Sequence, residues 1–338
     1  MTSSSTSSEK PRAPAHQYAP PFERRFLAPA FWPTWLGFAL VWCLALLPAA
    51  WRFALAGGLG RLAWHYNQKR REIVQTNLEW CFPELSASER ESLAKSYSRY
   101  LSLAMLDIGL FWWGSEARFR RSVVLQDDGA LAQSLAAGRK VIIVTCHTPG
   151  LDRGGVALSA DYPFETFVKP VRNRLLEWML ARRRVRFGGV VFPRSGGLRP
   201  VIRGLRQGYA LYILTDEDLG AESAEFVPFF GIPRATLTTP SRLAGMVEVD
   251  LYTSYTWYDR QQHRYVVQVF PKLEGFPGES EAADAARLNL RLEEMIRQHP
   301  DQYMWSLRLF KTMADGSPTP YWMKSRPGSG PRPRPETD

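Results

Sequence analysis

The clearest chemical signal in this sequence is a histidine followed, after four intervening residues, by an aspartate: His147 and Asp152. His147 follows an apolar, β-branched run at 141–144 after two further residues, and Pro149 and Gly150 interrupt the pattern. We therefore predict that His147 lies at the carboxyl end of a buried strand, where open α/β sheets place their ligands. Asp152 then falls in the first turn of the next helix, where its carboxylate can accept a hydrogen bond from the imidazole. Such a pair is a general base for a hydroxyl group.

The same residues also fit a purely structural interpretation. His147 can be a helix-capping or core histidine, and Asp152 can be an acid favoured by the helix dipole, an effect of about 0.3 to 1 kcal/mol. The neighbouring Cys146 points to the opposite face of the strand, so we expect a buried structural cysteine and no nucleophile. The motif alone leaves both interpretations open.

A second polar group follows the apolar strand predicted at 209–215: three acids, Asp216, Glu217 and Asp218. Three carboxylates at a strand end can form a magnesium site. Salt-bridged scaffolding is at least as good an interpretation, because arginines flank the acids at Arg194, Arg199, Arg203 and Arg206. The apolar segment within 226–244, FVPFFG, fits either a rim that touches an acyl chain or membrane, or plain burial.

Composition narrows the classes of partner. The 338 residues carry a net charge of +10, which favours phosphate-bearing or acidic partners: nucleic acid, an anionic membrane surface or an acidic protein. The three cysteines are too few and too scattered for a disulfide framework or a zinc site. No nucleic-acid recognition module accompanies the 12 tryptophans, and interfacial anchoring in a bilayer explains them more economically. No nucleotide-binding glycine pattern follows any predicted strand, so we expect no nucleotide cofactor.

For the N-terminal region we predict disorder over 1–25 and a membrane anchor with an interfacial helix over 26–72. The 21 residues at 31–51 carry no charge, and at 1.5 Å per residue they would span about 30 Å, the thickness of a hydrocarbon core. The long polar and basic segment before them argues against a cleaved signal peptide. A buried helical hairpin is the alternative, and Pro48 permits a kinked or partly inserted helix. The basic residues after the stretch predict a body on the cytoplasmic side.

Strand and helix patterns alternate from residue 139 onward. We predict strands at 141–145, 165–169, 190–193, 209–215, 250–258 and 265–271. We predict helices at 152–160, 172–185, 198–207 and 238–247. This order predicts an α/β fold with a mixed, mostly parallel sheet covered by helices on both faces, in which the last two strands fit an antiparallel pair. N-terminal to this α/β region, Ser86 and Glu89 predict a capping box for a helix that reaches about Phe111. The composition of the tail at 325–338 predicts disorder.

Together these pieces resemble the late acyltransferases of lipid A biosynthesis, the lauroyl and myristoyl transferases of the lysophospholipid acyltransferase superfamily. The resemblance covers about 22–324, with an acyltransferase domain over 73–324. Its motifs are FWPTWLG from Phe31, NLEWCFPEL from Asn77, His147 with Asp152, FPR at 192–194, DED at 216–218 followed by FVPFFG and TLTTPSRLA, and HPDQYMWSLRLFK at 299–311.

The resemblance implies transfer of a fatty acyl group from acyl carrier protein to a hydroxyl of an acyl chain on a lipid A precursor. It implies no cofactor, no metal and no acyl-enzyme, and a place on the cytoplasmic side of the bacterial inner membrane. His147 and Asp152 would be the catalytic pair. The substrate-binding positions it implies are Arg194, Arg199, Asp216 and Asp218. The two arginines would contact substrate phosphate or the developing oxyanion, and the two aspartates would have a structural or supporting role.

The sequence departs from the family pattern at two positions. Glu217 stands where we expect Gln, and Pro240 stands where we expect Gly or Ala, which puts the local turn and the fit of the acceptor in question. An H-x4-D motif does not itself name the acceptor or the carrier of the acyl group. Acylation of another glycolipid or lysophospholipid therefore stays an alternative, as does a non-catalytic, membrane-bound lipid-binding protein of the same fold.

Overall fold

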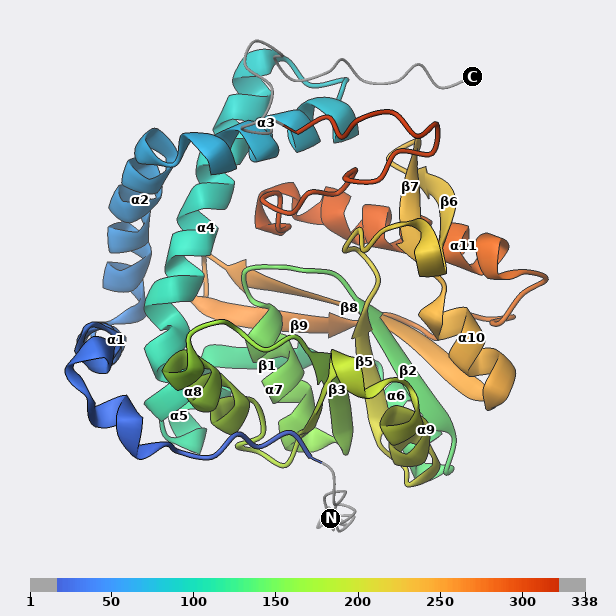
Figure 1. Cartoon of the computed structure of the whole chain (residues 1–338), viewed down its shortest axis with the longest axis horizontal. Coiled ribbons are helices and arrows are strands. Elements are labelled where there is room, and N and C mark those ends of the chain that lie inside the picture. The colour runs from blue at the N-terminus through green and yellow to red at the C-terminus, as the bar shows by residue number, and fades with distance from the viewer. Residues whose placement is uncertain (1–16, 322–338) are drawn as a thin grey trace.

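The central strand of the fold is β2 (Lys140–Thr145), whose side chains are buried on both faces of a seven-stranded sheet. Alternate residues point into two separate apolar cores: Ile142 lies in one and Ile143 in the other. A strand buried on both faces belongs in the middle of a sheet that helices cover on both sides. Figure 1 shows this arrangement in the computed structural model, which describes residues 17–321.

The strand order is β1-β9-β8-β2-β5-β3-β4. The other six strands are β1 (Val123–Gln126), β3 (Phe164–Val168), β4 (Val190–Pro193), β5 (Ala210–Leu214), β8 (Val249–Asp259) and β9 (Arg264–Val269). Strands β8, β2, β5, β3 and β4 run parallel, β9 is antiparallel to β8, and β1 is parallel to β9. The predicted mixed, mostly parallel sheet is confirmed, and so is the antiparallel pair. The short edge strand β1 was not predicted.

Helices pack on both faces of the sheet, as predicted. One core receives side chains from α5 (Glu116–Ser122), α6 (Ala130–Ala136), α7 (Leu151–Asp161) and α8 (Arg174–Arg184). The other receives side chains from α9 (Arg199–Arg206), α10 (Thr239–Met246) and α11 (Glu281–Gln298). Because helices cover the two faces, the carboxyl ends of the parallel strands are the part of the sheet that is left open to a ligand.

The apolar stretch at 31–51 does not form one helix, which corrects the predicted membrane-spanning segment. It is divided between α1 (Trp32–Ala45) and α2 (Ala49–Tyr66), and Pro48 precedes α2 as its N-cap. Proline lacks a backbone N–H and disfavours helical geometry in the residue before it, which explains the break. No helix within the described part of the chain combines the length and apolar character needed to cross a membrane.

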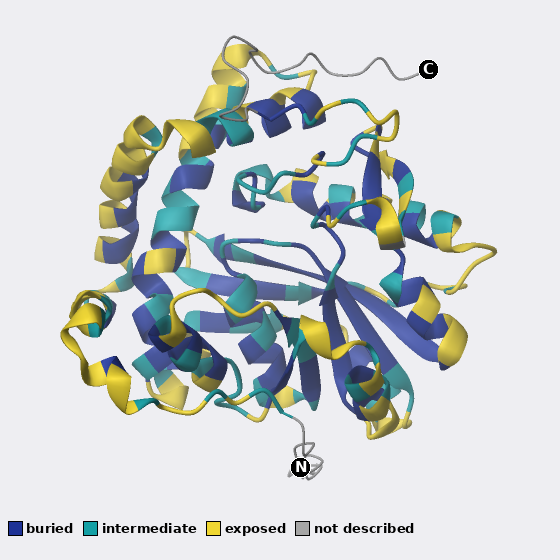
Figure 2. Ribbon diagram, viewed as in Figure 1, coloured by how far each residue is buried: buried dark blue, intermediate teal, exposed yellow. Residues whose placement is uncertain are grey.

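Helix α2 packs along the long helix α4 (Ala87–Trp113), and α3 (Gln68–Cys81) lies between them in the sequence. The predicted capping box of Ser86 and Glu89 is present at the start of α4. The side of α2 that faces α4 is buried and its outer side is exposed (Figure 2).

Short 3-10 helices at Arg24–Leu27 and Pro29–Phe31 precede α1. Of the segment 1–25, the described part begins at residue 17, and the backbone N–H of Tyr18 donates to the carbonyl of Val191 at 2.9 Å. The tail at 325–338 lies outside the described residues.

The apolar FVPFFG segment belongs to a two-stranded hairpin, β6 (Ala224–Phe229) and β7 (Ile232–Leu237). Phe230 and Gly231 form its turn with φ angles of 51° and 75°, the left-handed geometry of a tight hairpin. Phe229 and Phe230 are buried, so burial is the correct interpretation and the exposed acyl-binding rim is not formed by these side chains. A last 3-10 helix, Pro300–Gln302, leads into the C-terminal segment.

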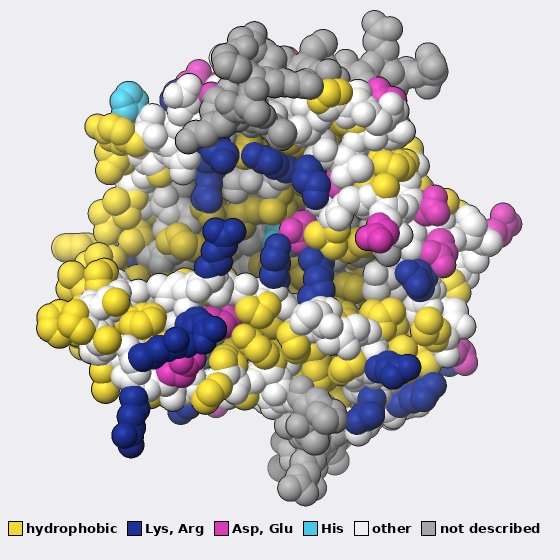
Figure 3. Space-filling model, in the orientation of Figure 1, with side chains coloured by type: hydrophobic (Ala, Val, Ile, Leu, Met, Phe, Trp, Pro, Cys, Tyr) yellow, Lys and Arg dark blue, Asp and Glu magenta, His cyan; other side chains and the backbone are white. Residues whose placement is uncertain are grey.

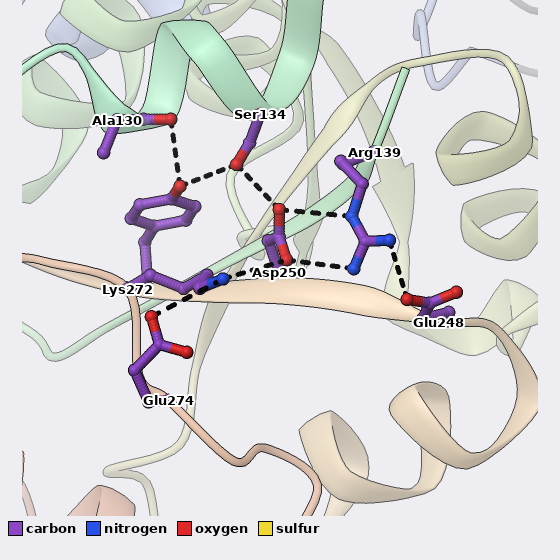
Figure 4. Close-up of polar contacts among 8 residues, drawn as sticks. Ala130, Ser134, Arg139, Glu248, Asp250, Lys272 and Glu274 are labelled. Carbon is purple, nitrogen blue, oxygen red and sulfur yellow. Dashed lines mark hydrogen bonds and ion pairs between the residues drawn. The ribbon is translucent and has the colours of Figure 1, made fainter. Parts of the chain in front are cut away.

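At the amino ends of the strands, polar side chains satisfy one another (Figure 4). Asp250 of β8 accepts a hydrogen bond from Ser134 at 2.7 Å and forms an ion pair with Arg139 at 3.2 Å. Burial favours the neutral acid, but these contacts and the nearby Lys272 outweigh it and hold the pKa of Asp250 below its usual value. These contacts at the amino ends of the strands hold α6 against β8 and have a structural role.

Candidate active site

His147 lies two residues beyond the carboxyl end of β2, and Asp216 lies two residues beyond the end of the neighbouring strand β5. The two strands are parallel, and Thr145 pairs with Leu214 in their register. His147 and Asp216 each lie two residues beyond this pair on their own strand, and so they come together. The imidazole Nδ1 is 2.8 Å from Asp216 Oδ1, and the His147 backbone N–H donates to Asp216 Oδ2 at 2.7 Å.

This contact determines which imidazole nitrogen can act as a base. An ionised carboxylate only accepts hydrogen bonds, so Nδ1 carries the proton and donates it to Asp216. In the neutral ring Nε2 then holds the free lone pair. The His147 side chain is one quarter exposed, whereas Asp216 is fully buried. The base is therefore accessible and the group that orients it is protected from water.

The charges of this pair support each other. Burial alone would lower the pKa of His147, but the charge and hydrogen bond of Asp216 outweigh burial and raise it above 6.5. Burial alone would likewise raise the pKa of Asp216, but His147 and the buried guanidinium of Arg234 bring it below its usual value. Asp216 is thus an anion at neutral pH, and it stabilises the imidazolium that forms when His147 accepts a proton.

Asp152 is not the partner of the imidazole, which corrects the predicted hydrogen bond. Its two carboxylate oxygens accept hydrogen bonds from Arg184 Nε and Nη2 at 2.9 and 3.2 Å, a bidentate pair between the start of α7 and the last residue of α8. The ring of His147 is instead turned toward β5 and Asp216. Asp152 still lines the same cavity as His147, so the structure brings the two residues to one site without direct contact.

Two cavities meet at His147. The first has a volume of about 350 Å³ and extends along apolar residues of α4 and under α7, including Met105, Ile108, Phe111 and Gly155. The second has a volume of about 380 Å³, and its lining includes Lys169, Arg194 and Glu217. Figure 3 shows a hollow on this face of the molecule with Lys and Arg side chains gathered around it. His147 therefore stands where two cavities meet, each lined by both apolar and charged side chains.

The remaining predicted substrate residues occupy different places. Arg194 lines the second cavity and forms an ion pair with Glu217 at 3.3 Å. Arg199 is exposed as the first residue of α9, and it is not among the described residues that line either cavity. Asp218 accepts hydrogen bonds from the backbone N–H and the hydroxyl of Thr312, at 2.6 and 2.8 Å, and so fixes the C-terminal segment beside the site.

The three acids at 216–218 thus have three separate partners, which supports the scaffolding interpretation. Asp216 holds His147, Glu217 pairs with Arg194, and Asp218 holds Thr312. Within residues 17–321, no group of three or more His, Cys, Asp or Glu side chains is arranged to hold a metal ion.

Sequence reasoning missed three residues that shape the site. Arg184 neutralises Asp152, and Lys169 lines both cavities just beyond the end of β3. Met304 lines the first cavity, and its backbone N–H donates to the carbonyl of His147 at 2.9 Å. The position of Lys169 as the last residue of the strand predicted at 165–169 was the one local signal that could have found it.

Fold and site together define a class: an α/β enzyme with a histidine at the carboxyl end of its central strand. This histidine is oriented by a buried aspartate and can deprotonate a hydroxyl group at the junction of two cavities. Comparison with known families is more specific. The family described as bacterial lipid A biosynthesis acyltransferase matches residues 19–312, and the chain belongs to this family, whose members are O-acyltransferases.

Three relatives illustrate the match. The lipid A biosynthesis palmitoleoyltransferase of Escherichia coli K12 is 29% identical over 301 residues, which cover 89% of this chain and 98% of the relative. The lipid A biosynthesis myristoyltransferase of the same organism is 30% identical over 313 residues, covering 91% of this chain and 96% of the relative. A lipid A biosynthesis acyltransferase of Haemophilus influenzae is 30% identical over 300 residues, covering 88% and 94%.

Proposed function

We propose that this enzyme transfers a fatty acyl group from acyl carrier protein to a hydroxyl of an acyl chain on a lipid A precursor, with His147 as general base. The observation that carries the proposal is the His147–Asp216 pair at the junction of two cavities, one of which extends along apolar residues of α4. Membership of the lipid A acyltransferase family supports the acceptor, since the relatives are named for that pathway. The basic character of the chain, +10 overall, suits both an acidic carrier protein and a phosphorylated acceptor.

The proposed reaction needs no covalent enzyme intermediate because a thioester is already activated. His147 Nε2 removes the proton of the acceptor hydroxyl as its oxygen attacks the thioester carbonyl. The tetrahedral intermediate collapses, the carbon–sulfur bond breaks, and the imidazolium returns the proton to the leaving thiolate. Asp216 keeps the ring in the productive tautomer and stabilises its positive charge, which in such sites contributes roughly 10²- to 10⁴-fold to the rate.

The two cavities suit the two parts of the substrates. The first cavity, lined by apolar residues of α4, suits a fatty acyl chain. The second, with Lys169 and Arg194, suits a phosphate-bearing group, because guanidinium and ammonium groups bind phosphate through charge-assisted hydrogen bonds. Arg199 lies outside both cavities, so the proposal gives the substrate contact predicted for it to Lys169 instead.

We also propose that the enzyme lies on the cytoplasmic face of the bacterial inner membrane through α1 and α2. Large apolar side chains are exposed along these helices: Trp32, Leu36, Leu40, Trp42, Leu46, Trp51, Leu55, Leu59 and Leu62. Exposed basic residues flank them at Arg24, Arg25, Lys69 and Arg70. An apolar surface bordered by cations is typical of helices that lie in the interface of an anionic bilayer.

The test is an assay of purified enzyme in detergent with acyl carrier protein thioesters of mixed chain length and a tetra-acylated lipid A precursor, read by mass spectrometry. We expect the precursor to gain the mass of one acyl chain. His147→Ala should lower the rate at least 10²-fold, because the base is lost, while His65→Ala, an exposed histidine of α2, should leave it unchanged.

Three outcomes would count against the proposal. Wild-type enzyme that is folded but leaves the precursor unmodified would exclude this acceptor and favour another glycolipid or a lysophospholipid. Full activity in His147→Ala would exclude the general-base mechanism. Equal rates with coenzyme A thioesters would remove the requirement for acyl carrier protein.

A further inference from the structure

A second apolar site lies outside the catalytic cavities, between α2 and α4. Its walls are Leu59, Leu62 and Tyr66 of α2 and Met105 and Leu106 of α4, and its volume is about 410 Å³. We refer to it as the α2–α4 groove. Leu62 and Met105 are each 55% exposed, so large apolar side chains face outward here. A row of exposed apolar residues in a groove marks a place where another apolar group binds.

The two helices that carry the groove residues pack closely against each other. Gly60 of α2 lies directly against the backbone of α4, because a side chain there would meet the Arg99 backbone nitrogen at 2.8 Å. The hydroxyl of Ser98 donates to the Gly60 carbonyl at 2.8 Å and fixes the same contact. This contact fixes the spacing of the two helices, and the groove beside it is lined by the small residues Ala63 and Ser102 and by the larger apolar side chains.

The residues at the two ends of the groove indicate what kind of ligand it would bind. At one end Met105 lines both the groove and the first catalytic cavity, so the two adjoin at this side chain. At the other end the groove shares Ala63 and Ser102 with a small hollow lined by Arg70 and Arg71. An apolar groove that adjoins the catalytic cavity at one end and two arginines at the other matches a lipid that carries both an acyl chain and a phosphate.

We propose that the α2–α4 groove binds an acyl chain of the acceptor that is not being modified, with an acceptor phosphate at Arg70 and Arg71. This inference rests on the proposed function, which supplies an acceptor with several acyl chains and phosphates. The continuity through Met105 favours the acceptor over a bilayer phospholipid, because only the acceptor must also reach His147. The groove would hold the acceptor in the orientation that brings its hydroxyl to the base.

The experiment measures KM for the tetra-acylated precursor in detergent micelles, where no bilayer is present. In the double variant Leu59→Gln/Leu62→Gln we expect KM for the precursor to rise about tenfold, because two apolar contacts with the chain are lost. The kcat and the KM for the acyl donor should change less than about twofold, as expected for a loss of acceptor binding alone. Leu36→Gln/Leu40→Gln, which alters exposed residues of α1 outside the groove, is the matched control and should leave all three constants unchanged in micelles.

The phosphate contact has its own test. Arg70→Gln/Arg71→Gln should raise KM for the phosphorylated precursor, and that difference from wild type should vanish with a chemically dephosphorylated precursor. Arg61→Gln, an exposed arginine of α2 outside the groove lining, is the control for net charge.

Two results would overturn the inference while leaving the proposed function intact. In the first, the groove variants would behave like the α1 variants, with unchanged KM in micelles and weaker binding to phospholipid vesicles, and the groove would be only part of a bilayer-facing surface. In the second, the arginine variants would be equally impaired with both precursors. Failure of wild-type enzyme to acylate the precursor would instead refute the proposed function.

Discussion

The residue that determines the chemistry of this site is Asp216, because it sets both the orientation and the pKa of His147. Its hydrogen bond to Nδ1 leaves the free lone pair on Nε2, and its charge raises the pKa of the imidazole despite burial. Asp152, the acid adjacent in the sequence motif, is bound to Arg184. The two carboxylates therefore affect His147 to different extents, and kinetics can separate them.

The pH dependence of kcat/KM should report the His147–Asp216 pair. A general base works only when neutral, so the rate should rise with pH through the folded-state pKa of His147, and this acid limb should have its inflection above 6.5. In Asp216→Asn burial dominates, so the inflection should move to lower pH, and the rate on the plateau should fall about 10²- to 10⁴-fold.

The comparison variant is Asp152→Asn. We expect it to leave the inflection near the wild-type position, because Asp152 is not hydrogen-bonded to the ring. A shift of the inflection in Asp152→Asn with none in Asp216→Asn would show that the assignment of the two carboxylates is reversed.

Sequence predicted His147 correctly as a residue at the end of a strand, but it could not predict its partner. The strand signal of β2 is local, a continuous apolar run that ends at a turn. The contact with Asp216 depends on β5 being the neighbour of β2, and the two strands are separated by β3 and β4 in the chain. Strand order is set by long-range packing, so the nearest acid in the sequence, Asp152, was the better local guess and was wrong.

At the level of elements, α2 is joined to the body by a buried ion pair. Arg52 of α2 contacts Asp107 of α4 at 2.5 Å, and the hydroxyl of Tyr265 on β9 donates to the same carboxylate at 3.0 Å. Arg52 also donates to the carbonyl of Leu47 at the break between α1 and α2. One carboxylate thus connects the N-terminal helices to the catalytic sheet.

Removal of the cation from this ion pair should destabilise the protein. Arg52→Gln leaves Asp107 buried without its counterion, and we expect the free energy of unfolding to fall by about 3–5 kcal/mol. Chemical denaturation in detergent, followed by circular dichroism, measures it. Arg61→Gln on the exposed side of the same helix should change it by less than about 0.5 kcal/mol, and a similar loss in both variants would contradict the role given to the pair.

The elements also show where sequence patterns mislead. The charge-free stretch at 31–51 has the composition of a membrane span, and hydropathy does not register the effect of Pro48 on the backbone. The FVPFFG segment is apolar because Phe229 and Phe230 fill a core between the hairpin and α11, a contact between distant parts of the chain. In the first case a local backbone effect determined the outcome, and in the second it was burial against a distant element; composition specifies neither.

At the scale of the whole molecule, an apolar surface and a positive charge occur together. The exposed apolar residues of α1 and α2 and the net charge of +10 predict binding to anionic vesicles by two separable contributions. Raising the ionic strength to about 1 M, where the Debye length is about 3 Å, should weaken vesicle co-sedimentation without abolishing it. Leu36→Gln/Leu40→Gln should weaken binding at every salt concentration; salt-independent binding would refute the electrostatic part.

The ion pair at Arg52 has a consequence for how the chain can be divided. A shortened protein that begins at α3 would lose the counterion of Asp107 and would uncover the side of α4 on which α2 packs. The N-terminal helices are therefore no detachable tether but a part of the cooperative folding unit. We therefore expect that removal of α1 and α2 after cleavage between α2 and α3 would destabilise the rest of the enzyme.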